Sequence, residues 1–138
     1  MVRLFTYGSL MCDDIMIHVA GPCRRLGSAT LNDYICLSVK DEQYPAIVPR
    51  QGSATKGVVY ESISDRGLLN LDEFEGEMYA RKTVVVRLHT GVEITVHTYV
   101  CKPVYSQMLL DDEWCFDTFL QRGKADFIAK YVGFSKIG

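Results

Sequence analysis

Hydrophobic and polar residues alternate along several stretches of the chain, which is the spacing of β strands. We expect strands or extended segments over residues 2–7, 23–39, 44–49, 57–62, 79–88 and 92–101. A break is expected at Gly27-Ser28, and prolines at both ends of residues 44–49 prevent that segment from being helical. His89-Thr90-Gly91 predicts a hairpin turn between the last two strands.

The hydrophobic spacing changes to that of a helix in two places before residue 80. Residues 12–19 are long enough for one or two helical turns. In residues 64–76, Ser64 or Asp65 is suited to begin a helix and Gly76 to end it. The apolar residues of this second helix, three positions apart, are Leu68, Leu71 and Phe74.

A third helix is expected in the last part of the chain. The acidic residues 111–113 suit the positive end of a helix dipole, and Gly123 is expected to end the helix. Residues 124–131 could add a further turn. The apolar face of this helix would hold Phe116, Phe119 and Leu120.

Several of the expected strands follow one another directly along the chain. This order favours antiparallel pairing in a barrel-like or strongly bent sheet, with two or three helices, over a doubly wound parallel sheet. The chain has 138 residues and contains no internal repeat, low-complexity segment or linker. We therefore expect a single domain over residues 1–138.

The composition is that of a globular protein, with 48% hydrophobic and 23% charged residues. Fifteen Lys and Arg against seventeen Asp and Glu give a net charge of −2, without the basic surface that nucleic acid requires. The apolar runs are too short to span a membrane, and the N-terminus lacks the apolar core of a signal peptide. The five cysteines form no CxxC pair and are typical of reduced thiols. We expect a cytoplasmic protein with neither nucleic acid nor membrane as a partner.

The sequence contains none of the common metal, nucleotide or hydrolase motifs. Its three histidines, His18, His89 and His97, share no spacing typical of metal ligands and are expected to be solvated or structural. No metal site is predicted.

One acidic residue of the helix predicted over residues 64–76 is expected to point inward. With about 100° between successive residues, Glu75 falls inside the apolar stripe, whereas Glu73 faces solvent. An apolar setting raises the pKa of a carboxyl and suits it to proton transfer near neutral pH. The alternative is that Glu75 forms an ion pair with Arg81 or Lys82 at the end of the helix.

The segment Tyr7-Gly8-Ser9-Leu10, directly after the first strand, is a second candidate for chemistry. Glycine at the exit of a strand lets neighbouring backbone N–H groups converge on one point, where they bind an anion or an oxyanion. Most segments of this kind are plain turns, so this reading stays open on the residues alone.

Several blocks of the sequence resemble the γ-glutamylcyclotransferase-like, or AIG2-like, family. They occur in the family's order across about residues 2–100. The blocks are Leu4-Phe5-Thr6-Tyr7-Gly8-Ser9-Leu10, Tyr44-Pro45-Ala46-Ile47-Val48-Pro49, Gly57-Val58-Val59-Tyr60-Glu61, Leu71-Asp72-Glu73-Phe74-Glu75-Gly76 and Tyr79-Ala80-Arg81.

The resemblance implies an α+β fold, a compact, mixed, mostly antiparallel β-barrel with two or three flanking helices. It also implies a cavity in which the Tyr-Gly-Ser-Leu loop faces Glu75. The reaction of the better-characterised members is intramolecular aminolysis: the α-amine of a γ-glutamyl compound attacks its own γ-carbonyl, giving 5-oxoproline and a free amine or amino acid. Such an enzyme, of acyltransferase or lyase type, needs neither a metal nor an organic cofactor.

By the same resemblance, Glu75 would act as general base and then as general acid. Backbone N–H groups of the loop would hold the substrate carboxylate or the oxyanion. Arg81 could hold a substrate carboxylate, but a surface pair with Glu73 or Glu77 is favoured. The predicted substrate-binding residues are Tyr7, Gly8, Ser9, Leu10, Tyr44, Tyr79 and Tyr105, although ordinary partial burial is the favoured explanation for the last three.

Leu10 resembles the γ-glutamylamine branch of the family rather than the glutathione-pathway members. The implied partner is a small γ-glutamyl substrate, and the implied assembly is a monomer or weak homodimer. Two alternatives remain: a non-catalytic module that binds a small carboxylate on the same scaffold, and an enzyme acting on another γ-glutamyl substrate. Residues 102–112 and the tail after Gly123 are candidates to cover the site.

Overall fold

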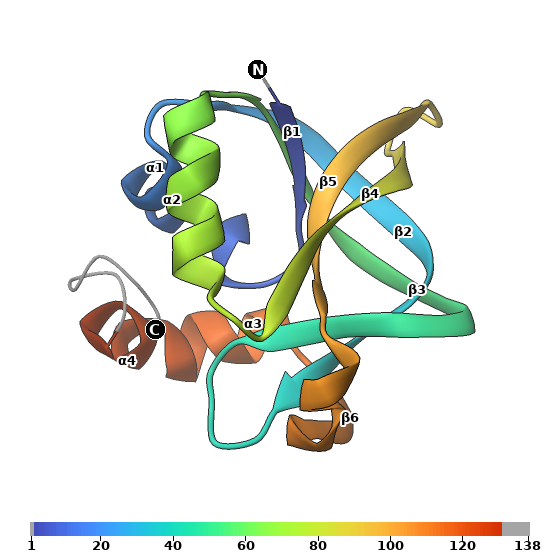
Figure 1. The fold of residues 1–138 in the computed structure, drawn as a ribbon, viewed down its shortest axis with the longest axis vertical. Coiled ribbons are helices and arrows are strands. Elements are labelled where there is room, and N and C mark those ends of the chain that lie inside the picture. Colours follow the sequence, from blue (N-terminus) through green and yellow to red (C-terminus); the bar gives the residue numbers. More distant parts are fainter. Residues whose placement is uncertain (1, 131–138) are drawn as a thin grey trace.

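The computed structural model describes residues 2–130 and contains one six-stranded sheet, five strands of which close into a barrel (Figure 1). Around the barrel the order is β3, β1, β5, β4 and β2, and β2 pairs again with β3. Only the β1–β5 pair is parallel. The strands are β1 (Val2–Thr6), β2 (Arg24–Val39), β3 (Pro45–Ile63), β4 (Tyr79–Leu88), β5 (Glu93–Cys101) and β6 (Leu109–Glu113). The expected mixed, mostly antiparallel barrel is confirmed.

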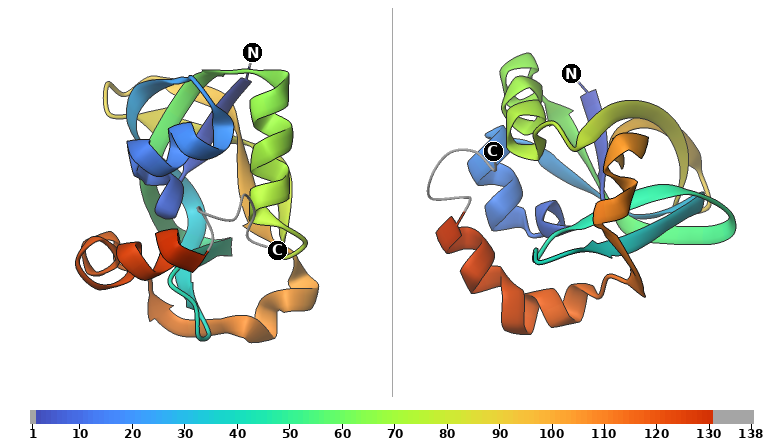
Figure 2. Two further views of the ribbon diagram at one scale, coloured as in Figure 1. Left: turned by 90° about the vertical axis from the view of Figure 1, so that its left-hand side faces the viewer. Right: turned by 60° about the horizontal axis from the view of Figure 1, so that its bottom comes forward.

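Helices cover one side of the barrel and one end of it (Figure 2). Helices α1 and α2 pack side by side, and the C-terminal helices run past the lower end of α2 as drawn in Figure 1. The helical elements are η1 (Ser9–Met11), α1 (Asp13–Ala20), α2 (Asp65–Glu75), η2 (Pro103–Met108), α3 (Phe116–Thr118), the π-helical turn η3 (Phe119–Gly123) and α4 (Lys124–Lys130). None of the helices in residues 2–130 is both long and apolar enough to cross a membrane.

Two hydrophobic clusters hold the fold together. One fills the barrel interior with strand residues such as Phe5, Val59 and Val96. The other lies between the barrel and the helices, and includes Leu4, on the opposite face of β1 from Phe5, and Phe74 on α2. This division follows from the period of two along each strand, which sends successive side chains to opposite faces. All five cysteines are free.

The prediction of two separate extended segments at residues 44–49 and 57–62 is wrong. Both belong to one strand, β3, which runs continuously from Pro45 to Ile63. Residues between them keep pairing with β2. The break predicted at Gly27-Ser28 is a register shift within β2, where Gly27 has a φ of 152°. Such a bulge bends a strand without ending it.

The helix predicted from residues 111–113 to Gly123 is also wrong at both ends. Residues 109–113 form β6, which pairs with the outer part of β2 and leaves its acidic side chains exposed. Charged side chains are common on such edge strands. Gly123 does not end the helix either, because the chain continues through η3 into α4 while Gly123 packs against Gln43. The π turn changes the helical register, so that Leu120 is exposed rather than on the apolar face.

The helix that bears Glu75 begins and ends as predicted. The Ser64 side chain accepts a hydrogen bond of 3.0 Å from the Gly67 N–H, and Gly76 follows the last helical residue with a φ of 79°. This cap holds α2 in register, and therefore fixes which of its residues face the barrel.

We expect Ser64→Ala to lower the free energy of unfolding by about 1 kcal/mol, because an N-cap hydrogen bond is lost. Ser64→Asp should retain most of the wild-type stability, since an aspartate accepts the same bond. Urea denaturation of the three proteins measures the difference. Equal stability of the Ala and Asp variants would show that the cap contributes nothing.

Candidate active site

A cavity opens where the end of β1, the η1 turn and the last turn of α2 meet. Its empty space is about 390 Å³, counted out to its open mouth and including open solvent. The lining residues are Leu4, Phe5, Thr6, Tyr7, Gly8, Ser9, Leu10, Tyr44, Pro45, Phe74, Glu75, Tyr79 and Tyr99.

Glu75 lies in this cavity because of its place at the end of α2. Leu71 and Phe74 of the same helix are buried against the barrel. Glu75 directly follows Phe74 and is only partly exposed. Its carboxyl makes no hydrogen bond or ion pair with any residue of the described range 2–130. The alternative partner Arg81 binds Asp72 instead, and the prediction that it pairs with Glu73 or Glu77 is wrong.

The environment favours the protonated form of this carboxyl. Burial, and then the negative charge of Asp72 one helical turn earlier, raise the pKa of Glu75 from the ordinary 4.5 to about 8. A carboxyl with a pKa near neutrality accepts and returns a proton readily under physiological conditions.

Three tyrosines surround Glu75, but each donates its hydroxyl proton to another acceptor. The Tyr7 hydroxyl donates to the Tyr99 carbonyl at 2.6 Å, and the Tyr79 hydroxyl donates to the Pro45 carbonyl at 2.7 Å. The Tyr99 hydroxyl donates to Asp72 Oδ1 at 2.6 Å. Burial is the main cause that raises the pKa of Tyr7, Tyr79 and Tyr99, so all three stay neutral. The rings therefore form the wall of the cavity and leave the carboxyl free.

The loop after β1 forms another part of the cavity wall. Gly8 lies against Pro45, where an added Cβ would come within 2.8 Å of the proline ring. The chain then turns into η1, in which the Met11 N–H bonds the Gly8 carbonyl at 3.0 Å. The N–H groups of Ser9 and Leu10 have no acceptor among the described residues, as is usual for the first residues of a helical turn. These donors are available to an anionic group of a ligand.

Of the predicted substrate-binding residues, the structure brings Tyr7, Tyr44 and Tyr79 together with the loop and Glu75. Tyr105 lies outside this cavity, in the wall of a neighbouring groove that also contains Tyr44. The predicted roles of all these residues remain to be tested.

The sequence reasoning missed Tyr99, Phe74 and Pro45 as lining residues. Tyr99 shares one face of β5 with Glu93 and His97, which suggests a polar face, but both faces of β5 are buried near its end. The absence of charged residues between His97 and Cys101 is the signal that could have revealed this.

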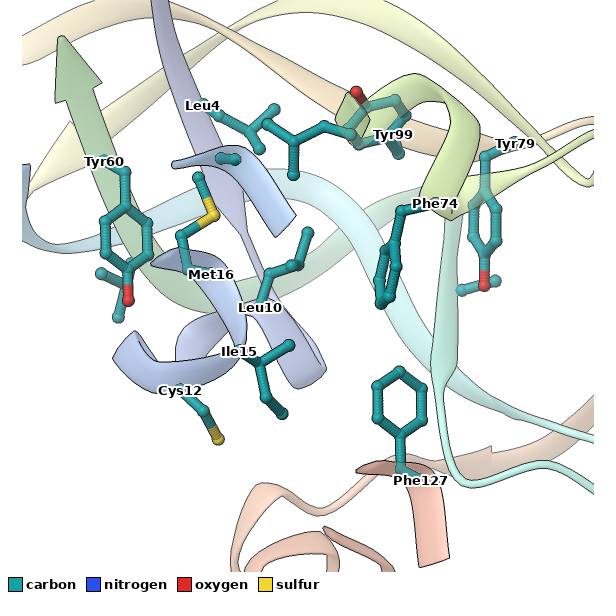
Figure 3. Packing of buried hydrophobic residues seen from close by; sticks show 14 of the residues in the cluster. Leu4, Leu10, Cys12, Ile15, Met16, Tyr60, Phe74, Tyr79, Tyr99 and Phe127 are labelled. Carbon is teal, nitrogen blue, oxygen red and sulfur yellow. The ribbon is translucent and has the colours of Figure 1, made fainter. Parts of the chain in front are cut away.

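Residues 102–112 and the tail after Gly123, the candidates to cover the site, lie in different places relative to the cavity. Residues 103–108 form η2, part of which borders the neighbouring groove instead. Phe127 of α4 contacts Phe74 and Tyr44, with ring centroids 6.0 and 6.4 Å apart, so this helix supports the cavity wall (Figure 3). Residues 131–138 of the tail lie outside the described residues. Within the described range, no group of three or more His, Cys, Asp or Glu side chains comes together as candidate metal ligands.

Comparison with known proteins identifies relatives that share this sequence and fold. A family model described as "Gamma-glutamyl cyclotransferase, AIG2-like" matches residues 4–116. AIG2-like protein C of Arabidopsis thaliana is 36% identical over 126 residues, which cover 91% of this chain and 73% of that protein. A solution structure of an Arabidopsis thaliana protein matches with a TM-score of 0.72 and 28% identity, covering 93% of this chain and 86% of that one. A structure named γ-glutamyl cyclotransferase has the same fold, with a TM-score of 0.66 and 23% identity over 78% of this chain and 75% of its own.

The raised pKa of Glu75 makes a prediction for stability. The folded protein holds this proton more tightly than the unfolded chain, so stability is lost as the pH rises from about 4.5 through about 8. Glu75→Gln removes that loss. We expect the variant to match the wild type near pH 4 and to be more stable at pH 8, by on the order of 4 kcal/mol.

Urea denaturation at pH 4, 6 and 8 tests this prediction, with Glu73→Gln as the matched control. Glu73 is exposed on the same helix, so its replacement should give no pH-dependent gain. A constant difference between Glu75→Gln and the wild type at all three pH values would contradict the raised pKa.

Proposed function

Because this chain belongs to the γ-glutamyl cyclotransferase, AIG2-like family, we propose that it is a cofactor-independent γ-glutamyl cyclotransferase. It would convert a γ-glutamyl compound into 5-oxoproline and a free amine or amino acid. The observation that supports this most strongly is the unpaired carboxyl of Glu75, enclosed in a cavity opposite unbonded backbone N–H groups.

The first step requires removal of a proton. The α-amine of the substrate enters as an ammonium ion and has no lone pair for attack until it is deprotonated. Ionised Glu75 would accept this proton as general base. No described side chain competes for the carboxyl, so its lone pairs are available to the substrate.

The second step forms the ring. The amine nitrogen attacks the γ-carbonyl carbon of the same molecule, and the carbonyl oxygen becomes an oxyanion. The N–H groups of Ser9 and Leu10 would stabilise either this oxyanion or the substrate α-carboxylate. The reaction requires the substrate to be held folded in the cavity, with its amine close to its own carbonyl.

The last step breaks the bond between the γ-carbon and the leaving nitrogen. As the oxyanion collapses to a carbonyl, the proton held by Glu75 passes to that nitrogen, which departs as a neutral amine. Ionised Glu75 then accepts the second proton that the ring nitrogen must lose to become an amide, and passes it to the departing amine or to water, which returns Glu75 to its ionised form. We expect the departing group to be an amine rather than an amino acid, because Leu10 resembles the γ-glutamylamine branch of the family. These steps require neither a metal nor an organic cofactor.

Product detection tests the proposal directly. Purified protein is incubated with γ-glutamyl amines, γ-glutamyl amino acids and glutathione, and 5-oxoproline is measured by mass spectrometry. We expect product from at least the amines. Glu75→Gln should lower the rate by about 10²–10⁴-fold, the usual contribution of general acid–base catalysis.

The exposed-residue variant Glu73→Gln is the matched control and should retain the wild-type rate. Turnover that persists in Glu75→Gln would remove Glu75 from the mechanism. Saturable binding of a γ-glutamyl compound by the folded protein, with no product across the panel, would favour the non-catalytic binding module.

The pH dependence of the rate follows from the state of Glu75. Only the ionised carboxyl accepts the ammonium proton, so kcat/KM should rise with pH and reach half its plateau near pH 8. Steady-state rates between pH 6 and 9 measure this. A profile that is flat across this range would show that Glu75 does not titrate during the reaction.

A further inference from the structure

Asp72 lies one helical turn before Glu75 on α2, outside the lining of the cavity. We propose that Asp72 is a positioning residue for Glu75, acting through its contacts with Arg81 on β4 and Tyr99 on β5. The inference rests on the proposed function in that Glu75 is the group that transfers the proton.

The contacts of Asp72 join the helix to two strands of the barrel. Arg81 donates two hydrogen bonds to its carboxylate, from Nε to Oδ1 at 2.9 Å and from Nη2 to Oδ2 at 3.3 Å. The Tyr99 hydroxyl donates to Oδ1 at 2.6 Å. Two-point binding by a guanidinium fixes direction as well as distance. The side chain of Asp72 therefore holds the last turn of α2 at one place on the sheet.

The main chain of Asp72 also stabilises that turn. Its carbonyl accepts the Gly76 N–H at 3.2 Å, which closes the helix directly after Glu75. Asp72 therefore fixes the helix on both sides of Glu75. Its side chain binds Arg81 and Tyr99 one turn before Glu75, and its carbonyl binds the Gly76 N–H directly after Glu75.

The same network reaches the opposite side of the cavity. The carbonyl of Tyr99 accepts the hydroxyl of Tyr7 at 2.6 Å, and Tyr7 directly precedes the Gly8 loop. Asp72, Tyr99 and Tyr7 therefore connect the helix that bears the acid to the loop that bears the free N–H groups. A substrate that spans acid and loop needs this separation to be fixed.

The charge of Asp72 acts on Glu75 as well. The charged and titratable groups around Glu75 are Tyr7, Tyr44, Tyr79, Tyr99, Asp72 and, beyond Asp72, Arg81. Among them, only Asp72 adds to burial in raising the pKa of Glu75, by repulsion between like charges at positions i and i+3. Removing the charge of Asp72 should lower the pKa of Glu75. Removing Arg81, the cation that neutralises Asp72, should raise the pKa of Glu75.

Two variants test these opposite shifts in the pKa of Glu75. Asp72→Asn keeps an oxygen for Tyr99 and Arg81 but loses the charge, and we expect the Glu75 midpoint to fall by about 0.5–1 pH unit. Arg81→Gln leaves Asp72 unneutralised, and the midpoint should rise. Glu73→Gln loses the same charge from the exposed side of α2 and should leave the midpoint unchanged. Titration of the Glu75 carboxyl carbon by NMR, assigned with Glu75→Gln, gives each value without requiring turnover.

Kinetics then test positioning. At pH 9, where Glu75 is ionised in each protein, Asp72→Asn should lower kcat by roughly tenfold with KM little changed, because Asp72 does not line the cavity. The inference is overturned if Asp72→Asn titrates like the wild type, if both variants shift the midpoint in the same direction, or if kcat is unaffected. A wild type that forms no 5-oxoproline refutes the proposed function instead, and the NMR midpoints still decide the electrostatic role of Asp72.

Discussion

Burial of the apolar stripe of α2 is the constraint on which the candidate site depends. Leu71 and Phe74 are almost fully enclosed, and Phe74 meets Phe127 of α4 in an edge-to-face contact. A helix that buries residues 71 and 74 must turn residue 75 toward the same side, because the period is about 3.6 residues. Figure 3 shows Phe74 pointing into the cluster between Leu10 and Phe127. The carboxyl of Glu75 is therefore carried inward by hydrophobic packing, not drawn there by a polar partner.

The polar groups around the cavity are arranged so that none of them neutralises this carboxyl. Tyr7 and Tyr79 donate to main-chain carbonyls, and Tyr99 donates to Asp72. Arg81, a nearby cation, is bound to Asp72 in a two-point ion pair. Satisfying these groups with one another avoids the cost of unpaired buried donors. It also leaves the Glu75 carboxyl and the first N–H groups of η1 without partners among the described residues.

The sequence predicted the elements whose structure depends on residues close together in the chain. The spacing of Leu68, Leu71 and Phe74, with Ser64 and Gly76 as caps, was enough to place Glu75 inward. The β6 strand was not predictable in the same way, because acidic residues 111–113 are held by main-chain pairing with β2, a partner more than seventy residues away. The choice of Asp72 as the partner of Arg81 likewise depends on how α2 lies across β4. The π turn at Phe119–Gly123 buries Phe119 and Gly123, and the spacing of hydrophobic residues gives no sign of it.

A structural role alone does not account for Glu75. The free-energy cost of burying a carboxyl is usually offset by a hydrogen bond or an ion pair. Glu75 has neither within residues 2–130. A glutamine would fill the same space without the cost of ionisation above pH 4.5. Membership in a fold family does not by itself establish a reaction. An acid that is unpaired and whose pKa lies near neutrality supports the proposed proton transfer, because glutamate can gain and lose a proton here and glutamine cannot.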